Sequence, residues 1–165
     1  MREKPGVPQI REPAVAGLFY PDDPLLLQQQ VDNLLAQEVA VGAAPKALIV
    51  PHAGFIYSGP VAASAYLQLA SVREQIQRFV LLGPAHRVAF SGVAASSARY
   101  FSTPLGMVRI DQQAMDAILG LPQVRVLDEA HRDEHSLEVQ LPFLQYKLGN
   151  NIQIVPVVLG TQSAD

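Results

Sequence analysis

Apolar side chains recur at helical spacing in some stretches of the chain and form short continuous runs in others. Leu27, Val31, Leu34 and Leu35 repeat every three or four residues, a spacing typical of one buried helix face. Residues 47–50 and 79–82 are continuous apolar runs, which are typical of buried strands. The pattern predicts helices over residues 24–39, 60–69, 112–119 and 137–148, and strands over residues 47–50, 79–82, 93–96, 107–110, 124–127 and 152–159.

Polar residues at the predicted helix starts support these boundaries. Asp22 or Asp23 precedes Pro24, a residue favoured in the first turn of a helix. Asp111 and Ser136 stand in the corresponding positions before two later helices. Their side-chain oxygens are expected to accept hydrogen bonds from the first free backbone N–H groups.

The alternation of strands and helices is typical of an α/β fold. We expect a three-layer α/β/α sandwich with a mostly parallel central sheet. Residues 1–12 are predicted to form an unanchored N-terminal arm, and residues 13–165 a single domain. Strand 152–159 is expected to be central because it is apolar throughout. Since the chain ends six residues after it, we also expect the domain to be truncated at its C-terminus.

Composition narrows the classes of function. Hydrophobic residues make up 49% and charged residues 16% of the 165 positions, so a sizeable core is expected. The net charge of −3 and the lack of a basic run argue against a nucleic-acid partner. No apolar run is long enough to cross a membrane, no signal peptide is recognisable, and a cytoplasmic location is predicted. Without cysteine, thiolate metal sites are excluded within this stretch.

Two histidines directly follow predicted buried strands. His52 comes after strand 47–50 and His86 after strand 79–82. Ligands bind beyond the carboxyl ends of parallel strands, so both imidazoles are expected at one edge of the sheet. Neutral imidazole binds iron, copper or zinc, and it also suits proton transfer. The alternative is that both are ordinary loop histidines.

A third cluster lies in the charged segment 128–138. His135 immediately precedes the predicted helix cap and is expected to point into the same cleft, whereas His131 is predicted to lie on the surface. Glu134, Tyr57 and Ser58 are assigned to the pocket lining. Alternatively, Tyr57 and Ser58 only pack, and the acidic residues belong to a solvated loop.

Five blocks of sequence resemble the Memo family, also called AmmeMemoRadiSam system protein B. They occur in family order and extend over nearly the whole chain from Arg11. The blocks are residues 11–20 (REPAVAGLFY), 51–59 (PHAGFIYSG), 82–86 (LGPAH), 103–106 (TPLG) and 133–143 (DEHSLEVQLPF).

The resemblance implies a relative of the class III extradiol dioxygenases, which use non-heme Fe(II). It places His52 and His86 on the family's two metal-ligand histidines, and His135 on a histidine of the same pocket. It also implies Fe(II) or copper as cofactor and a functional link to radical-SAM proteins. Arg87 departs from the family, which often has a second histidine at this position. The family's later Ser-Asp-x-x-His and Cys-bearing segments lie beyond Asp165.

Three functions remain open on this basis. In the first, a metal held by His52 and His86 supports redox chemistry of dioxygenase type, with His135 orienting substrate or moving a proton. In the second, the pocket is a non-catalytic module that binds a peptide or small molecule. In the third, the site is incomplete. Two histidines are one ligand short of a usual catalytic site, so weak or absent metal binding is expected. Uncovered apolar surface also predicts a homo-oligomer.

Overall fold

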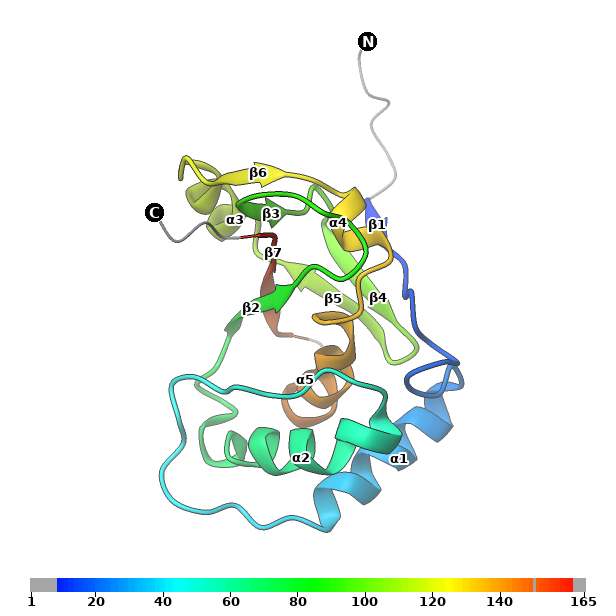
Figure 1. The fold of residues 1–165 in the computed structure, drawn as a ribbon. Coiled ribbons are helices and arrows are strands. Elements are labelled where there is room, and N and C mark those ends of the chain that lie inside the picture. The colour runs from blue at the N-terminus through cyan, green and yellow to red at the C-terminus, as the bar shows by residue number, and fades with distance from the viewer. Residues whose placement is uncertain (1–8, 150, 162–165) are drawn as a thin grey trace.

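A mixed, curled sheet forms the centre of the computed structural model, which describes residues 9–149 and 151–161 (Figure 1). In chain order, the elements are β1 (Ile10–Arg11), α1 (Pro24–Ala36), α2 (Phe55–Leu67), the 3₁₀ turn η1 (Ala70–Val72), β2 (Arg78–Pro84), β3 (Val93–Ala95), β4 (Tyr100–Thr103), β5 (Gly106–Ile110), α3 (Gln112–Leu119), β6 (Val124–Val126), α4 (Glu129–Arg132), the 3₁₀ turn η2 (Glu138–Gln140), α5 (Leu141–Leu148) and β7 (Gln153–Leu159). No helix within the described residues combines the length and apolar character that crossing a membrane requires.

Strand β7 is central, as its apolar sequence predicts. It pairs in parallel with β2 along seven residues and in parallel with β5 near its start, and antiparallel with β3 near its end. Ile154 and Val158 on this strand are completely buried. Because β5 and β3 share β7, the sheet divides into a β5–β4–β1 branch and a β3–β6 branch, which gives it a curled form.

The α/β class is confirmed, but the prediction of a mostly parallel sheet is wrong. Strands β4 and β5 form an antiparallel hairpin in which Thr103 pairs with Gly106. Only Pro104 and Leu105 connect them, and so short a loop joins antiparallel strands only. Gly106 has φ +117°, a backbone conformation that favours glycine. The expected three-layer sandwich is therefore corrected to an α/β fold with a mixed sheet, in which α1, α2 and α5 pack together (Figure 1).

Several predicted boundaries change. Residues 47–50 form no strand; Leu48 and Val50 are half-buried and Ile49 is fully exposed. Helix α2 begins at Phe55 rather than at Pro60. The predicted helix caps Asp23 and Asp111 are confirmed, since each accepts hydrogen bonds from backbone N–H groups.

The segment after His135 also differs from the prediction. Ser136 does not cap a helix, because its hydroxyl donates to the carbonyl of Pro84. The chain passes through the η2 turn before α5 begins at Leu141. The predicted loop before His135 contains the short helix α4.

A buried ion pair fastens the beginning of the described chain to the segment before α5. Within the predicted arm, residues 1–8 lie outside the described residues, but Arg11 is buried and forms part of β1, which pairs with β4. Its guanidinium bonds the carboxylate of Glu138 and the backbone carbonyls of His131 and Glu134. Glu138 is completely buried and also accepts hydrogen bonds from the Tyr20 hydroxyl and from two backbone N–H groups. The prediction that residues 1–12 lack anchoring contacts does not hold for Arg11.

His131 lies in the core, so its predicted surface position is wrong. It is buried against Phe101, and its Nε2 lies 3.0 Å from the carbonyl oxygen of Ala94. Because a carbonyl oxygen only accepts hydrogen bonds, Nε2 carries the hydrogen. Burial is the main cause that lowers the pKa of His131 to about 4.

We predict that Arg11→Met destabilises the fold by about 3 kcal/mol or more, because it leaves the Glu138 carboxylate buried without its counter-charge. Urea unfolding followed by circular dichroism measures the change. The control is Arg73→Met, whose partner Glu74 is exposed, and it should change the free energy of unfolding by less than about 0.5 kcal/mol. Equal effects of the two substitutions would contradict the prediction.

The depressed pKa of His131 predicts a loss of stability in mild acid. Between about pH 6.5 and pH 4, the unfolded chain takes up a proton that buried His131 does not, so the free energy of unfolding should fall by roughly 3 kcal/mol from this group. His131→Gln keeps a donor for Ala94 but cannot titrate, so its loss over the same range should be smaller by that amount. Parallel pH profiles for both proteins would show that His131 is not the titrating group.

Candidate functional site

Three of the four histidines converge at one end of β2. His52 follows the extended segment 47–51, His86 lies two residues beyond β2, and His135 lies between α4 and η2. Their ring centroids are 5.2 Å apart for His52 and His86, 4.6 Å for His86 and His135, and 5.8 Å for His52 and His135. One ring nitrogen from each lies within 4.8 Å of the others. The cluster therefore offers three imidazole nitrogens to one ion.

Close packing between Gly83 and the 135–137 segment brings His135 to His86. A side chain on Gly83 would place a Cβ atom 2.6 Å from Oγ of Ser136 and 2.7 Å from a methyl group of Leu137. The Ser136 hydroxyl donates a 3.0 Å hydrogen bond to the carbonyl of Pro84. The end of β2 and the loop before η2 are thus held in direct contact. His86 follows the first of these segments, and His135 lies in the second.

The Glu134 carboxylate fixes the orientation of the His86 ring. The carboxylate is buried and lies 2.8 Å from Nδ1 of His86, and it also accepts hydrogen bonds from the backbone N–H groups of His86, His135 and Ser136. Burial alone would raise the pKa of Glu134, but these hydrogen bonds outweigh it and lower the pKa to about 2. An ionised carboxylate only accepts, so Nδ1 of His86 carries a hydrogen and Nε2 is the nitrogen left to face a ligand.

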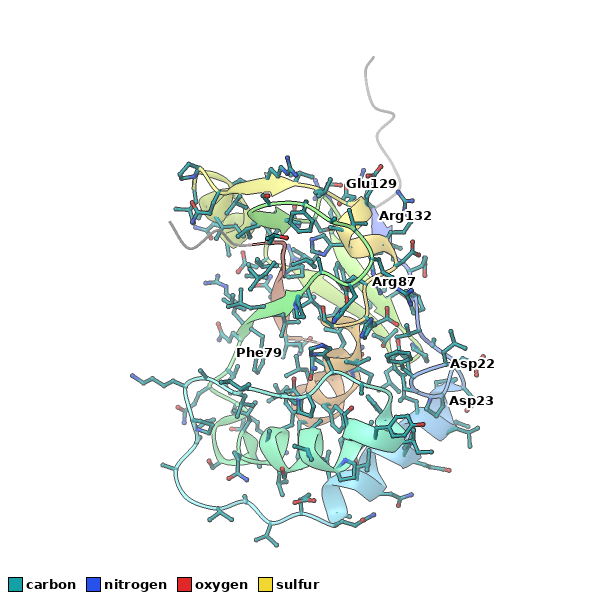
Figure 2. The ribbon with its side chains drawn as sticks, viewed as in Figure 1. Asp22, Asp23, Phe79, Arg87, Glu129 and Arg132 are labelled. Atoms are coloured by element: carbon teal, nitrogen blue, oxygen red, sulfur yellow. The ribbon has the colours of Figure 1, made fainter. Side chains whose placement is uncertain are left out.

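The surroundings of His52 and His135 favour the neutral imidazole. Burial is the main cause that lowers the pKa of His52, and the neighbouring His86 adds to it. Burial likewise lowers the pKa of His135, although the Glu134 carboxylate opposes the shift. Arg87 follows His86 in the exposed loop after β2 (Figure 2), and its positive charge lowers the pKa of His135 further. Neutral imidazole is the form that binds metal ions.

His135 retains an unpaired nitrogen. Its Nδ1 is buried and makes no hydrogen bond within the described part of the chain; Oε1 of Glu134 lies 3.4 Å away, outside hydrogen-bond geometry. Phe19 packs on the ring at a centroid distance of 4.9 Å. An unpaired buried nitrogen is unfavourable unless it serves a ligand or a proton.

An apolar groove of about 800 Å³ opens beside the histidines. His52 and His135 form its polar end, and the rest is lined by apolar residues from three segments, among them Leu18, Phe19, Ile49, Ile56 and Tyr57. Many of these side chains are largely exposed. The groove offers an apolar ligand a place next to the ring nitrogens.

The two predicted pocket residues from α2 have different positions. Tyr57 is exposed and lines the groove. Ser58 is buried, and its hydroxyl donates a 2.7 Å hydrogen bond to the carbonyl of Ala53 at the start of the helix. Ser58 therefore fixes the turn that follows His52 and does not face the groove.

Sequence reasoning missed the contacts that hold this site in place. Arg11 and Glu138 both lie in blocks that carry the family resemblance, but no local pattern indicates that they pair across more than a hundred residues. The close contact at Gly83 could not be predicted from the sequence either, because it depends on which loop packs against the end of β2. Glu138 stands between Leu137 and Val139, and a carboxylate between two apolar residues is the one signal that could have indicated a buried charge with a partner.

The chain matches the model of the Memo-like protein family over residues 11–165. It is 39% identical to a MEMO1 family protein of Sulfolobus acidocaldarius over 169 residues, which covers 94% of this chain and 59% of the relative. It is 42% identical to one of Aquifex aeolicus over 151 residues, covering 92% of this chain and 55% of the relative, and 39% identical to one of Methanobrevibacter smithii, covering 93% and 58%. The chain thus spans little more than half the length of these relatives. The family match extends over almost all of the described fold and includes every histidine of the cluster. This match shows that the chain belongs to the Memo family.

Proposed function

We propose that this chain binds one transition-metal ion, Fe(II) or copper, through His52, His86 and His135, and that the site serves metal-dependent redox chemistry. The observation that carries the proposal is the convergence of three ring nitrogens within 4.8 Å. Nitrogens that share one ion at about 2.0–2.1 Å stand roughly 3.3 Å apart in tetrahedral geometry, so binding would draw the rings slightly together. His86 is the most exposed of the three.

The donor set fits a metal that accepts imidazole. Iron, copper and zinc all do so. The cluster contains no carboxylate, and Glu134 is already engaged by three backbone N–H groups and His86. The arrangement of two histidines and one carboxylate typical of non-heme Fe(II) oxygenases is therefore not formed by the described residues. A bound Fe(II) or copper ion would supply one-electron redox chemistry, and the chain's own residues hold and orient it.

His135 is better suited to metal binding than to proton transfer. The sequence suggested only two ligands and gave His135 the role of a catalytic acid or base. Its closeness to both His86 and His52 favours a third ligand instead. Three protein nitrogens with open positions for small molecules are the usual composition of a catalytic metal centre.

The groove favours a second candidate function, a module that binds a small molecule or peptide without catalysis. Its exposed apolar walls suit an apolar ligand whether or not a metal is bound. The two functions share the groove and differ in their need for the histidines. Metal content therefore distinguishes them.

Because three histidines converge instead of the two ligands expected from the sequence, we replace the expectation of weak or absent metal binding. We predict stoichiometric binding of Fe(II) under anaerobic conditions, or of copper, at micromolar free ion. Calorimetric titration and elemental analysis after gel filtration measure it. His52→Ala, His86→Ala and His135→Ala should each weaken binding by more than 100-fold, because each removes a direct ligand.

His131→Gln is the matched control, since His131 is the one histidine outside the cluster. It should leave metal affinity unchanged. If the unaltered chain binds no metal at micromolar free ion, the proposal that these three histidines form a metal site in this chain is wrong. If only His135→Ala keeps full affinity, His135 is not a ligand.

We also predict that Glu134→Gln weakens metal binding by about 10–100-fold, the usual effect of losing the carboxylate behind a ligand histidine. The amide replaces one accepting oxygen with a donor, which opposes the Nδ1–H of His86 and the neighbouring N–H groups. Asp133→Asn removes the adjacent, exposed acid and is the control for net charge. Equal affinities for Glu134→Gln and the unaltered chain would show that Glu134 does not orient the ligand.

A further inference from the structure

We propose that the cavity beside His86 binds the carboxylate of an organic acid through Arg87, and that acids of this kind are the substrate class of the histidine site. Apart from His86, the residues that line this cavity lie outside the histidine cluster, so binding of the acid does not require a metal. The step from bound acid to substrate rests on the proposed function.

The Arg87 cavity lies where the loop after β2 passes the end of β7. Its volume is about 430 Å³, and residues 84–90 and 159–161 line it. This volume is within the range of small-molecule sites in proteins. None of the lining residues is an aspartate or a glutamate, and Arg87 is the one lining side chain with a permanent charge. The cavity therefore carries a positive charge without an acid to balance it.

Arg87 has no partner for its charge in the described part of the chain. It is exposed, and it forms no ion pair or hydrogen bond with any residue of the segments 9–149 and 151–161 (Figure 2). Glu134, the acid that contacts the neighbouring His86, is already engaged by that ring and by three backbone N–H groups. The planar guanidinium presents donors in a fork that matches the two oxygens of a carboxylate. An external carboxylate is the ligand that this side chain is best suited to bind.

The backbone of the same loop offers further donors. The N–H group of His86 already donates a 2.6 Å hydrogen bond to a carboxylate oxygen, that of Glu134. The next three N–H groups, of residues 87–89, have no acceptor among the residues that the structure describes. Hydrogen bonds from arginine and from backbone N–H groups to an ionised oxygen are among the strongest in proteins. An anion in this cavity would therefore meet donors that the fold leaves unused.

The position of the cavity connects the acid to the histidine cluster. His86 lines the Arg87 cavity, whereas His52 and His135 line the apolar groove. The His86 ring lies only 5.2 Å and 4.6 Å, between centroids, from the other two. A ligand at the cluster thus has a positive side chain beside His86 and an apolar surface beside the other two rings. This combination suits an organic acid with an apolar body.

The balance of charge favours a carboxylate over a phosphate group. A carboxylate carries a single negative charge, which one guanidinium neutralises. A phosphate monoester carries about 1.5 to 2 negative charges near neutral pH. The cavity has only Arg87 to offset them.

The experiment titrates the metal-free chain with octanoate and with octanamide, which has the same hydrocarbon tail and no charge. Calorimetry measures the two affinities. We expect octanoate to bind at least about tenfold more tightly than octanamide. Arg87→Gln should abolish this preference, and Arg87→Lys should keep part of it because the charge remains. The control is Arg125→Gln, which removes an exposed arginine of β6 outside the cavity and should keep the full preference.

Three results would overturn carboxylate binding by Arg87. They are equal affinities for octanoate and octanamide, a preference that survives Arg87→Gln, and a preference that Arg125→Gln abolishes equally. In the first case Arg87 is an exposed arginine that contacts only water. If inorganic phosphate displaces octanoate at an equal concentration, the cavity selects small anions, and the assignment to organic acids is wrong.

A second measurement tests the step from bound acid to substrate. In the copper-loaded chain, octanoate should change the electron paramagnetic resonance spectrum of Cu(II), and Arg87→Gln should suppress the change. An unchanged spectrum while octanoate is bound overturns the substrate assignment. If the chain binds no metal but keeps its preference for octanoate, the proposed function fails and carboxylate binding stands. If the chain binds metal without that preference, only the present proposal fails.

Discussion

The buried pair of Arg11 and Glu138 is the interaction on which the arrangement of the site depends. Glu138 is completely buried, and a carboxylate in that position is stable only when it is fully paired. Arg11 neutralises its charge and uses its remaining donors on the carbonyls of His131 and Glu134. One side chain from the first described strand therefore fixes both ends of the loop that carries Glu134 and His135.

Short, direct contacts from this loop position His86 and His135. Glu134 reaches His86 with its carboxylate, while its own backbone is held by Arg11. Ser136 bonds Pro84, and Gly83 leaves room for that approach. Two contacts therefore fix the position of His86 relative to His135: the hydrogen bond to the Glu134 carboxylate and the close packing at Gly83. Two independent restraints on one pair of rings are characteristic of a preorganised site.

Sequence reasoning placed His52 and His86 together because each follows an apolar run, and the central position of β7 followed from the same rule. Only the run before His86 forms a strand; the run before His52 does not, yet the two rings still meet. It could not place Arg11 or His131, because burial of a polar side chain depends on partners distant in sequence. The β4–β5 hairpin was missed because Pro104-Leu105 is not a typical hairpin turn. Residues 47–50 show a further limit of sequence reasoning. An apolar run indicates that a segment favours a strand, but the strand forms only if the edge of a neighbouring strand pairs with it.

The unpaired segment 47–50 also bears on the histidine cluster. Residues 47–50 and β2 both lead into the histidine cluster, and both show apolar side chains to solvent at the same margin of the sheet. His86 is restrained by Glu134 and by the packing at Gly83, whereas fewer contacts restrain His52: Ser58 holds the turn after it, and the segment before it pairs with no strand among the described residues. His52 is therefore the least restrained member of the cluster. Because residues 47–50 lead directly into it without pairing as a strand, its position is set by fewer contacts than that of His86.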